Sequence, residues 1–213
     1  MDRLPAARLS PLASRVDDVL ARYGYEIRRA IDAIDDAVAG GGGLFEPRTT
    51  DDEIRAAVED VLSGGPRAAD RGPERLDGDV VLYVDGSSRG NPGPSGAGAV
   101  IRPGGGRRVC LGRPVGSNAE NNVAEYAALQ MGLNAVVADG PPAAVEVRID
   151  SMTVIDDVWG DGDGLPSAAP FKSGIAENVA AVPECEWRHL ADDDPNPADA
   201  RAAVGADIAA LGP

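Results

Sequence analysis

Four acidic residues stand where predicted strands end or predicted helices begin. Asp85 closes the apolar run VVLYVD, and Asp150 closes the alternating run VEVRID. Glu125 lies in the helical pattern ENNVAEYAAL, and Asp199 falls in the first turn of a predicted C-terminal helix. In an open α/β sheet, ligands collect at the carboxyl ends of the strands, so the two aspartates meet there if their strands are neighbours.

A carboxylate cluster without His or Cys is typical of a site for Mg²⁺ or Mn²⁺. Like charges at short range repel strongly, and hard divalent ions with oxygen ligands neutralise them. Each acid also has a plain structural interpretation. Asp85 before Gly is a turn signal, Asp150 before Ser suits a helix cap, and Glu125 suits a solvated helix face. Asp199 would interact favourably with a helix dipole. The metal-site hypothesis therefore depends on the four acids occurring together.

The elements that position these acids alternate between strand and helix after residue 78. Period-two alternation predicts strands at 79–85, 97–102, 107–113, 145–150 and 184–190. Apolar spacing of three and four predicts helices at 119–138, 151–160 and 197–211. This order, βββαβαβα, implies an α/β fold with a mixed sheet and helices packed on its faces. Between the first two strands, a segment rich in Gly, Ser, Pro and Asn is predicted to let the backbone approach a polyanionic ligand.

The first 78 residues follow a different pattern. Residues 12–38 carry one apolar helical stripe that Gly24 interrupts. Thr50 and Glu53 have the spacing of a capping box that opens a helix through Leu62. A polar, Gly- and Pro-rich segment follows and reads as a linker. The predicted organisation is a helical N-terminal region of unknown role at 1–64, a linker at 65–78 and a main domain at 79–213.

The charge composition indicates adaptation to concentrated salt. The chain has 213 residues, with 35 acidic against 20 basic, and its net charge is −15. Only Lys172 is a lysine, and Asp outnumbers Glu. Because the Debye length falls to about 3 Å at molar salt, this net charge does not exclude a nucleic-acid partner. Two distant cysteines indicate neither a zinc site nor a disulfide framework. Without a long apolar run or a signal-peptide pattern, a cytoplasmic location is expected.

Four stretches resemble, in the same order, the motifs of the type 1 ribonuclease H (ribonuclease HI) family. They span residues 80 to about 210 and read YVDGSSRGNPGPSGAGAVI, SNAENNVAEYAALQMGL, VEVRIDSMTVIDDVWG and WRHLADDDPNPADARA. Together with the acidic composition, they resemble a halophilic, archaeal-like member. The resemblance implies a ribonuclease H-like fold, with a mixed five-stranded sheet and helices on both faces. It also implies that residues 79–213 hydrolyse the RNA strand of an RNA–DNA hybrid with two Mg²⁺ or Mn²⁺ ions.

The resemblance also assigns roles to individual residues. The implied catalytic and metal-binding residues are Asp85, Glu125, Asp150 and Asp199, with the first of them bridging both ions. The implied substrate-binding residues are Gly86, Ser87, Asn91, Asn121 and Asn122. Asn donates and accepts hydrogen bonds at once, which suits the 2′-hydroxyls displayed in the minor groove of a hybrid. His189 is a candidate auxiliary group for proton transfer or product release, unless the strand end holds it too rigidly.

Two alternative functions stay open at this stage. One is a catalytically quiet module that holds hybrid or duplex RNA, which retention of all four acids disfavours. The other is a related two-metal nuclease with another nucleic-acid substrate. The D-x-E strand motif of many exonucleases is absent, because Asp85 is followed by Gly86 and Ser87. Cleavage assays with hybrid, duplex RNA, duplex DNA and single strands separate these alternatives.

We expect the folded protein to gain stability as KCl rises from low to molar concentration. Salt screens the repulsion among the excess surface carboxylates, and the chain has almost no lysine to offset them. Circular dichroism melts at increasing KCl measure this. A melting temperature that stays flat or falls contradicts the prediction.

Overall fold

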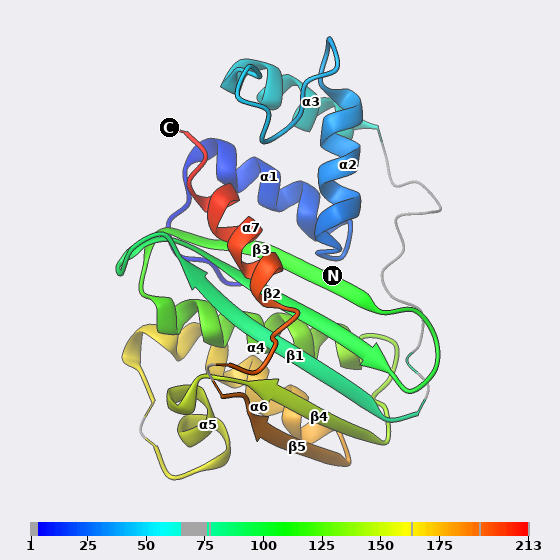
Figure 1. The fold of residues 1–213 in the computed structure, drawn as a ribbon, viewed down its shortest axis with the longest axis vertical. Coiled ribbons are helices and arrows are strands. Elements are labelled where there is room, and N and C mark those ends of the chain that lie inside the picture. The colour runs from blue at the N-terminus through cyan, green and yellow to red at the C-terminus, as the bar shows by residue number, and fades with distance from the viewer. Residues whose placement is uncertain (1–3, 65–75, 77, 163, 192, 213) are drawn as a thin grey trace.

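A mixed five-stranded sheet forms the centre of the fold (Figure 1). The computed structural model describes residues 4–64, 76, 78–162, 164–191 and 193–212. The strand order is β3-β2-β1-β4-β5, in which β1 pairs antiparallel with β2 and parallel with β4. The strands are β1 (Val80–Ser88), β2 (Gly93–Pro103), β3 (Val109–Ala119), β4 (Ala144–Ile149) and β5 (Glu184–His189). The predicted mixed sheet is confirmed, and the adjacency of β1 and β4 brings their carboxyl ends together.

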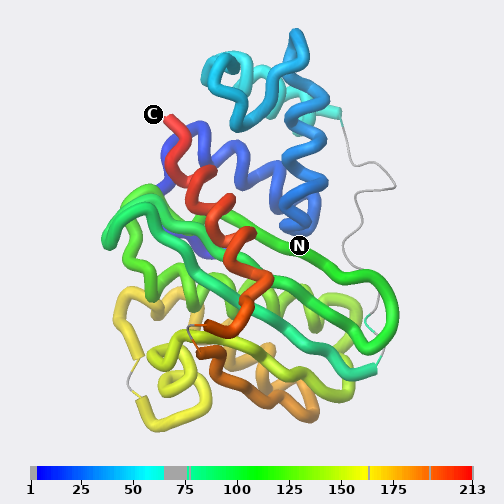
Figure 2. The backbone as a smooth tube through the Cα atoms, in the orientation of Figure 1, coloured from blue at the N-terminus to red at the C-terminus, as the bar shows by residue number. Residues whose placement is uncertain are grey.

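Helices cover both faces of this sheet, as the backbone trace in Figure 2 also shows. On one face α4 packs against β1 and β2, and α6 packs against α4. On the other face α7 crosses β1, β2 and β3. The helices of this part are α4 (Asn121–Val137), α5 (Met152–Trp159), α6 (Ala169–Ala181) and α7 (Asp199–Ala209), and a 3-10 turn, η2 (Pro166–Ala168), precedes α6. None of the described helices is long and apolar enough to cross a membrane.

Helix α6 is absent from the sequence-based prediction. Only Phe171 and Ile175 are buried along its 13 residues, so the apolar stripe is too narrow to stand out as a helical period. Pro170 falls in its first turn, where proline is tolerated because no intrahelical donor is needed there. In the sequence the same proline reads as a loop signal.

The glycine-rich segment forms strand rather than the predicted loop. β1 continues to Ser88 and β2 begins at Gly93, so only the short turn between them lies outside the sheet. A Cβ on Gly96 would lie 2.1 Å from the backbone N of Ala206 in α7, and one on Gly86 would lie 2.6 Å from the backbone N of Glu125 in α4. These two glycines therefore let helices press against the sheet. The approach of this segment to a ligand stays a prediction.

Three helices precede the sheet domain and confirm the predicted pattern. They are α1 (Pro11–Arg22), α2 (Ile27–Ala37) and α3 (Asp51–Ser63), so the helical stripe breaks around Gly24 as expected. Thr50 and Glu53 form the predicted capping box at the start of α3. The division into segments 1–64, 65–78 and 79–213 stays a prediction, and most of the proposed linker lies outside the described residues.

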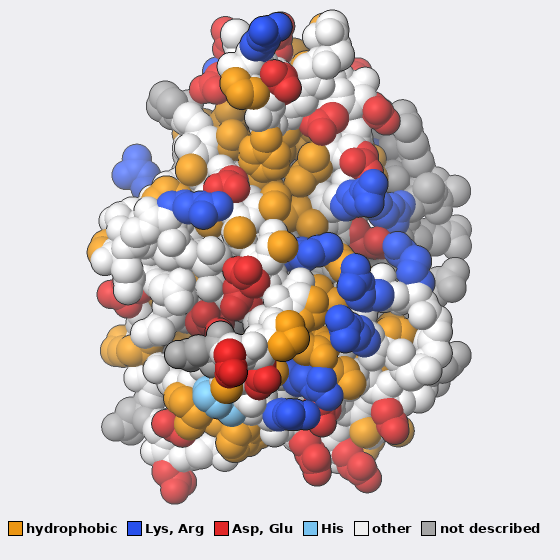
Figure 3. Space-filling view, viewed as in Figure 1, with side chains coloured by type: hydrophobic (Ala, Val, Ile, Leu, Met, Phe, Trp, Pro, Cys, Tyr) orange, Lys and Arg blue, Asp and Glu red, His pale blue; other side chains and the backbone are white. Residues whose placement is uncertain are grey.

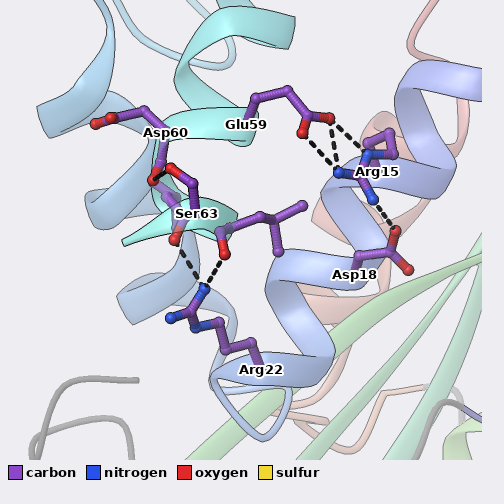
Figure 4. Close-up of polar contacts among 8 residues, drawn as sticks. Arg15, Asp18, Arg22, Glu59, Asp60 and Ser63 are labelled. Atoms are coloured by element: carbon purple, nitrogen blue, oxygen red, sulfur yellow. Dashed lines mark hydrogen bonds and ion pairs between the residues drawn. The ribbon is translucent and has the colours of Figure 1, made fainter. Parts of the chain in front are cut away.

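Arginines of α1 hold α3 in place (Figure 4). The Arg15 guanidinium donates two hydrogen bonds of 2.8 Å to the carboxylate of Glu59. Arg22 donates to the carbonyl oxygens of Val61 and Leu62, both at 2.8 Å. These carbonyls belong to the last turn of α3, where a helix has acceptors without intrahelical partners and a cation is favoured.

The N-terminal region also covers the edge of the sheet along β3. The N–H of Ala7 donates to the carbonyl of Val115 at 2.7 Å, and the N–H of Gly112 donates to the carbonyl of Tyr25 at 3.0 Å. Ser10 Oγ donates to the carbonyl of Leu211 at 2.8 Å, after the end of α7. An uncovered edge strand is a template for unwanted pairing, and these contacts occupy that edge at two places.

A buried ion pair joins α1 to β3. Arg113 Nη2 lies 3.3 Å from Asp17 Oδ2, and both side chains are 0% exposed. The same guanidinium donates to the carbonyl of Leu4 at 3.2 Å and lies 5.1 Å from the ring centroid of Tyr25. Removing one partner of a buried pair leaves an uncompensated charge, so this contact ties the sheet to the N-terminal region.

Asp17→Asn is expected to lower the free energy of unfolding by about 3 kcal/mol, because the Arg113 charge stays buried without its counter-charge. Asp18→Asn is the matched control, since Asp18 pairs with Arg15 in a partly exposed position where an ion pair contributes at most about 1 kcal/mol. Denaturant melts of both variants measure the difference. Equal loss in the two variants contradicts a special role for the buried pair.

Candidate active site

Three of the four predicted acids meet at the carboxyl ends of β1 and β4. Asp85, Glu125 and Asp150 each offer a carboxylate oxygen, and these atoms all lie within 4.8 Å of one another. Asp85 comes from β1, Asp150 directly follows β4, and Glu125 reaches the same place from the second turn of α4. The parallel pairing of β1 with β4 and the close packing of α4 on Gly86 produce this convergence.

Burial and neighbouring charges raise the pKa of two carboxylates, Asp85 and Glu125, in this acidic cluster (Asp85, Glu125 and Asp150). Burial, followed by repulsion from Asp150 and Asp199, raises the pKa of Asp85 from 3.8 to about 7. Burial raises the pKa of Glu125 well above its usual value, and the charges of Asp85 and Asp150 add to the effect. The N–H of Gly86 and the side chain of Asn121 oppose this rise in the pKa of Glu125. The folded chain therefore holds these groups at a free-energy penalty while they are charged.

One oxygen of the cluster has no protein donor. Glu125 Oε2 is buried and, among the described residues, has no hydrogen-bond partner. A buried carboxylate oxygen without a donor is costly, and a cation bound between the acids would satisfy it. Oxygen ligands alone are the set that hard divalent ions prefer, so these residues fit Mg²⁺ or Mn²⁺.

The structure separates the roles of the other acids at this edge. The N-cap residue of α5 is Ser151, which makes no side-chain cap hydrogen bond. Asp150 therefore does not serve as the helix cap. Asp199 begins α7 and lies outside the group of three, although its charge contributes to the raised pKa of Asp85. The structure thus places Asp199 beside the cluster rather than inside it.

Asn196 belongs to this site and was missed by the sequence analysis. Its Nδ2 donates to the carbonyl of Val84 at 2.9 Å and lies 3.4 Å from Asp85 Oδ1. Its Oδ1 accepts from the N–H of Ala198, just before α7. Asn196 therefore holds the start of α7 against the end of β1. An Asn shortly before a predicted helix is a signal for a local cap, but nothing in the sequence indicates the long-range contact.

The predicted substrate-binding residues line the same end of the sheet. Asn91 Oδ1 accepts from the N–H of Asn121 at 3.2 Å, which joins the β1–β2 turn to the start of α4. Gly86, Ser87 and Asn122 are partly exposed beside them. His189 ends β5 with an exposed side chain, and its Nε2 lies 3.2 Å from the carbonyl oxygen of Asp150. All of these residues are thus close to the acidic cluster, and their functional roles stay predictions.

The reverse transcriptase-like family matches residues 83–205, which is more than half of the chain. RNase H1 from the halophilic archaeon Halobacterium salinarum is similar in structure, with 33% sequence identity and a TM-score of 0.54 over 61% of this chain and 98% of that one. The chain belongs to the type 1 ribonuclease H family. Residues 1–82 lie outside the family match.

Two further comparisons give the same family. Ribonuclease HI of Halobacterium salinarum is 43% identical over 86 residues, which cover 40% of this chain and 43% of that protein. The match thus spans less than half of that curated relative's length. LC11-RNase H1, solved in complex with an RNA/DNA hybrid, has 29% identity and a TM-score of 0.55, covering 62% of this ribonuclease H-like chain and 99% of its own.

The metal-free Asp85→Asn variant is expected to be more stable than the wild type at pH 8. Asp85 has a higher pKa in the folded state, so its contribution to stability is full below about pH 4 and is lost as pH rises through about 7. Asn carries no charge and avoids this loss, which amounts to about 1.4 kcal/mol per pKa unit. The difference should shrink towards pH 5.

Thermal melts in EDTA between pH 5 and 8 measure this difference. Asp156→Asn on the exposed side of α5 is the control, and its melting temperature should follow the wild type at every pH. Added Mg²⁺ should raise the melting temperature of the wild type more than that of Asp85→Asn. An Asp85→Asn variant that is less stable at pH 8 would show that the carboxylate supports the fold.

Proposed function

We propose that this chain is an endoribonuclease that hydrolyses the RNA strand of RNA–DNA hybrids with two divalent metal ions. The convergence of Asp85, Glu125 and Asp150 within 4.8 Å, with a buried Glu125 oxygen lacking a protein donor, carries the proposal. Family membership supports the reaction class, and a relative solved in complex with an RNA/DNA hybrid supports the substrate class.

The acidic cluster and Asp199 are the proposed metal ligands. When bound, a pair of Mg²⁺ ions supplies an activated water and stabilises the leaving oxygen of an in-line displacement at phosphorus. The charges of both Asp150 and Asp199 act on the pKa of Asp85, so Asp85 would hold metal together with either of them. Asn196 is held by hydrogen bonds to the backbone of Val84 in β1 and of Ala198 before α7, and its Nδ2 helps to orient the carboxylate of Asp85.

The proposed substrate contacts come from the β1–β2 turn and the start of α4. Asn91, Asn121 and Asn122 present amide groups that read 2′-hydroxyls, which distinguish RNA from DNA. Ser95 Oγ, fully buried, lies within hydrogen-bonding distance of the carbonyl oxygens of Gly93 (2.9 Å) and Ala119 (3.1 Å). It links the start of β2 to the end of β3, which holds the turn that carries Asn91 in place. Binding without catalysis is the alternative, and the test below separates the two.

Asp85→Asn and Asp150→Asn should each reduce the single-turnover cleavage rate of a labelled hybrid by several orders of magnitude. Each swap keeps the side-chain shape and removes a charged ligand, so transition-state stabilisation is lost. Hybrid affinity should persist, because the three Asn residues are unchanged.

Asp156→Asn is the matched control and should cleave at the wild-type rate. Chelation by EDTA should abolish wild-type cleavage, and Mg²⁺ should restore it. An aspartate variant that keeps more than about a tenth of the wild-type rate removes that residue from the site. A wild type that binds hybrid but never cleaves it supports the binding-module alternative.

A further inference from the structure

Arginines gather on the sheet face that carries α7. Figure 3 shows Lys and Arg side chains in a band over this side of the molecule. Tyr83 faces this side, since it packs with Val100, Leu190 and Ala198, the residue before α7. In the strand register Arg148 pairs with Tyr83, and Arg188 pairs with Arg148. The residues Arg102, Arg148 and Arg188 are called the arginine strip below.

The arginine strip is held together by an aromatic ring. The guanidinium carbons of Arg102 and Arg148 lie 4.8 and 5.1 Å from the ring centroid of Tyr83. Cation–π attraction of this kind offsets the repulsion between neighbouring guanidinium groups. Both side chains also donate towards the Tyr83 hydroxyl. The ring therefore fixes two positive charges at the sheet surface.

Most of the positive charge of the strip is not neutralised within the protein. Arg148 forms an ion pair with Glu146. Arg102 and Arg188 are exposed, and among the residues that the structure describes no carboxylate forms an ion pair with either of them. The chain has 35 acidic residues against 20 basic ones, so neutralising partners are abundant elsewhere. A strip of cations left open on such a protein is complementary to an anionic ligand.

The arginine strip lies beside the acidic cluster, on the same and adjoining strands. Arg148 lies two residues before Asp150, Tyr83 lies two residues before Asp85, and Arg188 directly precedes His189. Two residues along a strand correspond to about 6.6 Å. A nucleic-acid strand that leaves the acidic cluster over this face therefore meets the arginine strip within its next phosphates.

We propose that the arginine strip binds the phosphates of a single-stranded overhang, RNA or DNA, that continues from a hybrid bound at the acidic cluster. This inference rests on the proposed function. Carboxylates lie on both sides of the strip, with the cluster at one side and the paired Glu146 and Glu186 at the other. A duplex on this face would press a second backbone against these acids, whereas a single strand follows the arginines alone. Arg–phosphate contacts carry no sequence information, so binding is sequence-independent.

The test compares the full-length wild type with R102Q/R188Q. Fluorescence anisotropy with a labelled 12-nucleotide oligo(dT) or oligo(U) in EDTA, between 0.1 and 0.6 M KCl, measures single-strand affinity without cleavage. We expect R102Q/R188Q to bind about tenfold more weakly at 0.1 M KCl, with a log–log salt slope smaller by about 1.4 for the two lost phosphate contacts. R28Q/R48Q, which removes two exposed arginines at and after α2, is the charge-matched control and should bind as the wild type does.

Cleavage in Mg²⁺ separates this inference from the proposed function. Blunt hybrid should be cut equally by wild type and R102Q/R188Q, while a hybrid with a single-stranded overhang should show a raised KM and an unchanged kcat in the variant.

R188Q alone repeats the test if the double variant melts at a lower temperature. Equal weakening in R28Q/R48Q, or unchanged oligonucleotide affinity in R102Q/R188Q, overturns the proposal. So does a wild-type dimer in sedimentation that R102Q/R188Q dissociates without changing oligonucleotide affinity, since the strip then binds a second copy. A wild type that binds oligonucleotide but leaves blunt hybrid uncut refutes the proposed function alone.

Discussion

Repulsion among carboxylates at the ends of β1 and β4 is the constraint that the surrounding structure must withstand. Asp85 and Glu125 are buried, and burial together with neighbouring charge raises the pKa of both. A loosely held site would relax by moving these side chains apart into water. The oxygens instead stay within 4.8 Å of one another, so the backbone that carries them must be rigid. A cation bound between these carboxylates would neutralise the repulsion, and the relief of repulsion would favour its binding.

Close contact between backbones supplies this rigidity. α4 lies so near to β1 that the position of Gly86 has no room for a side chain, and α7 lies still nearer to β2 at Gly96. Asn196 then fastens the start of α7 to the end of β1. Helices held at this distance cannot tilt or slide without a clash, and each delivers an acid: Glu125 from α4 and Asp199 from α7. Packing and chemistry thus depend on the same small residues.

The sequence predicted well wherever the signal was local or periodic. The strand pattern, the helix break at Gly24 and the capping box of Thr50 were all found, because each depends on neighbours in the chain. Four acids placed at element ends were enough to predict the cluster, and three of them converge. α6 was missed because few of its residues are buried and its proline suggested a loop. Long-range contacts such as Asn196 with Val84 and Arg113 with Asp17 leave no periodic trace. The same holds for the packing of helices against Gly86 and Gly96.

The contact between Ser10 and Leu211 has a consequence for folding during synthesis. Leu12 and Val16 of α1 belong to the same hydrophobic cluster as Ile208 of α7, so α1 is synthesised well before the part of its packing surface that α7 supplies. At translation rates of about 5–20 residues per second, this interval is on the order of 10–40 s. During that time the part of the apolar face of α1 that α7 covers in the native fold has no native partner, whereas the edge of β3 that the N-terminal region covers is made earlier.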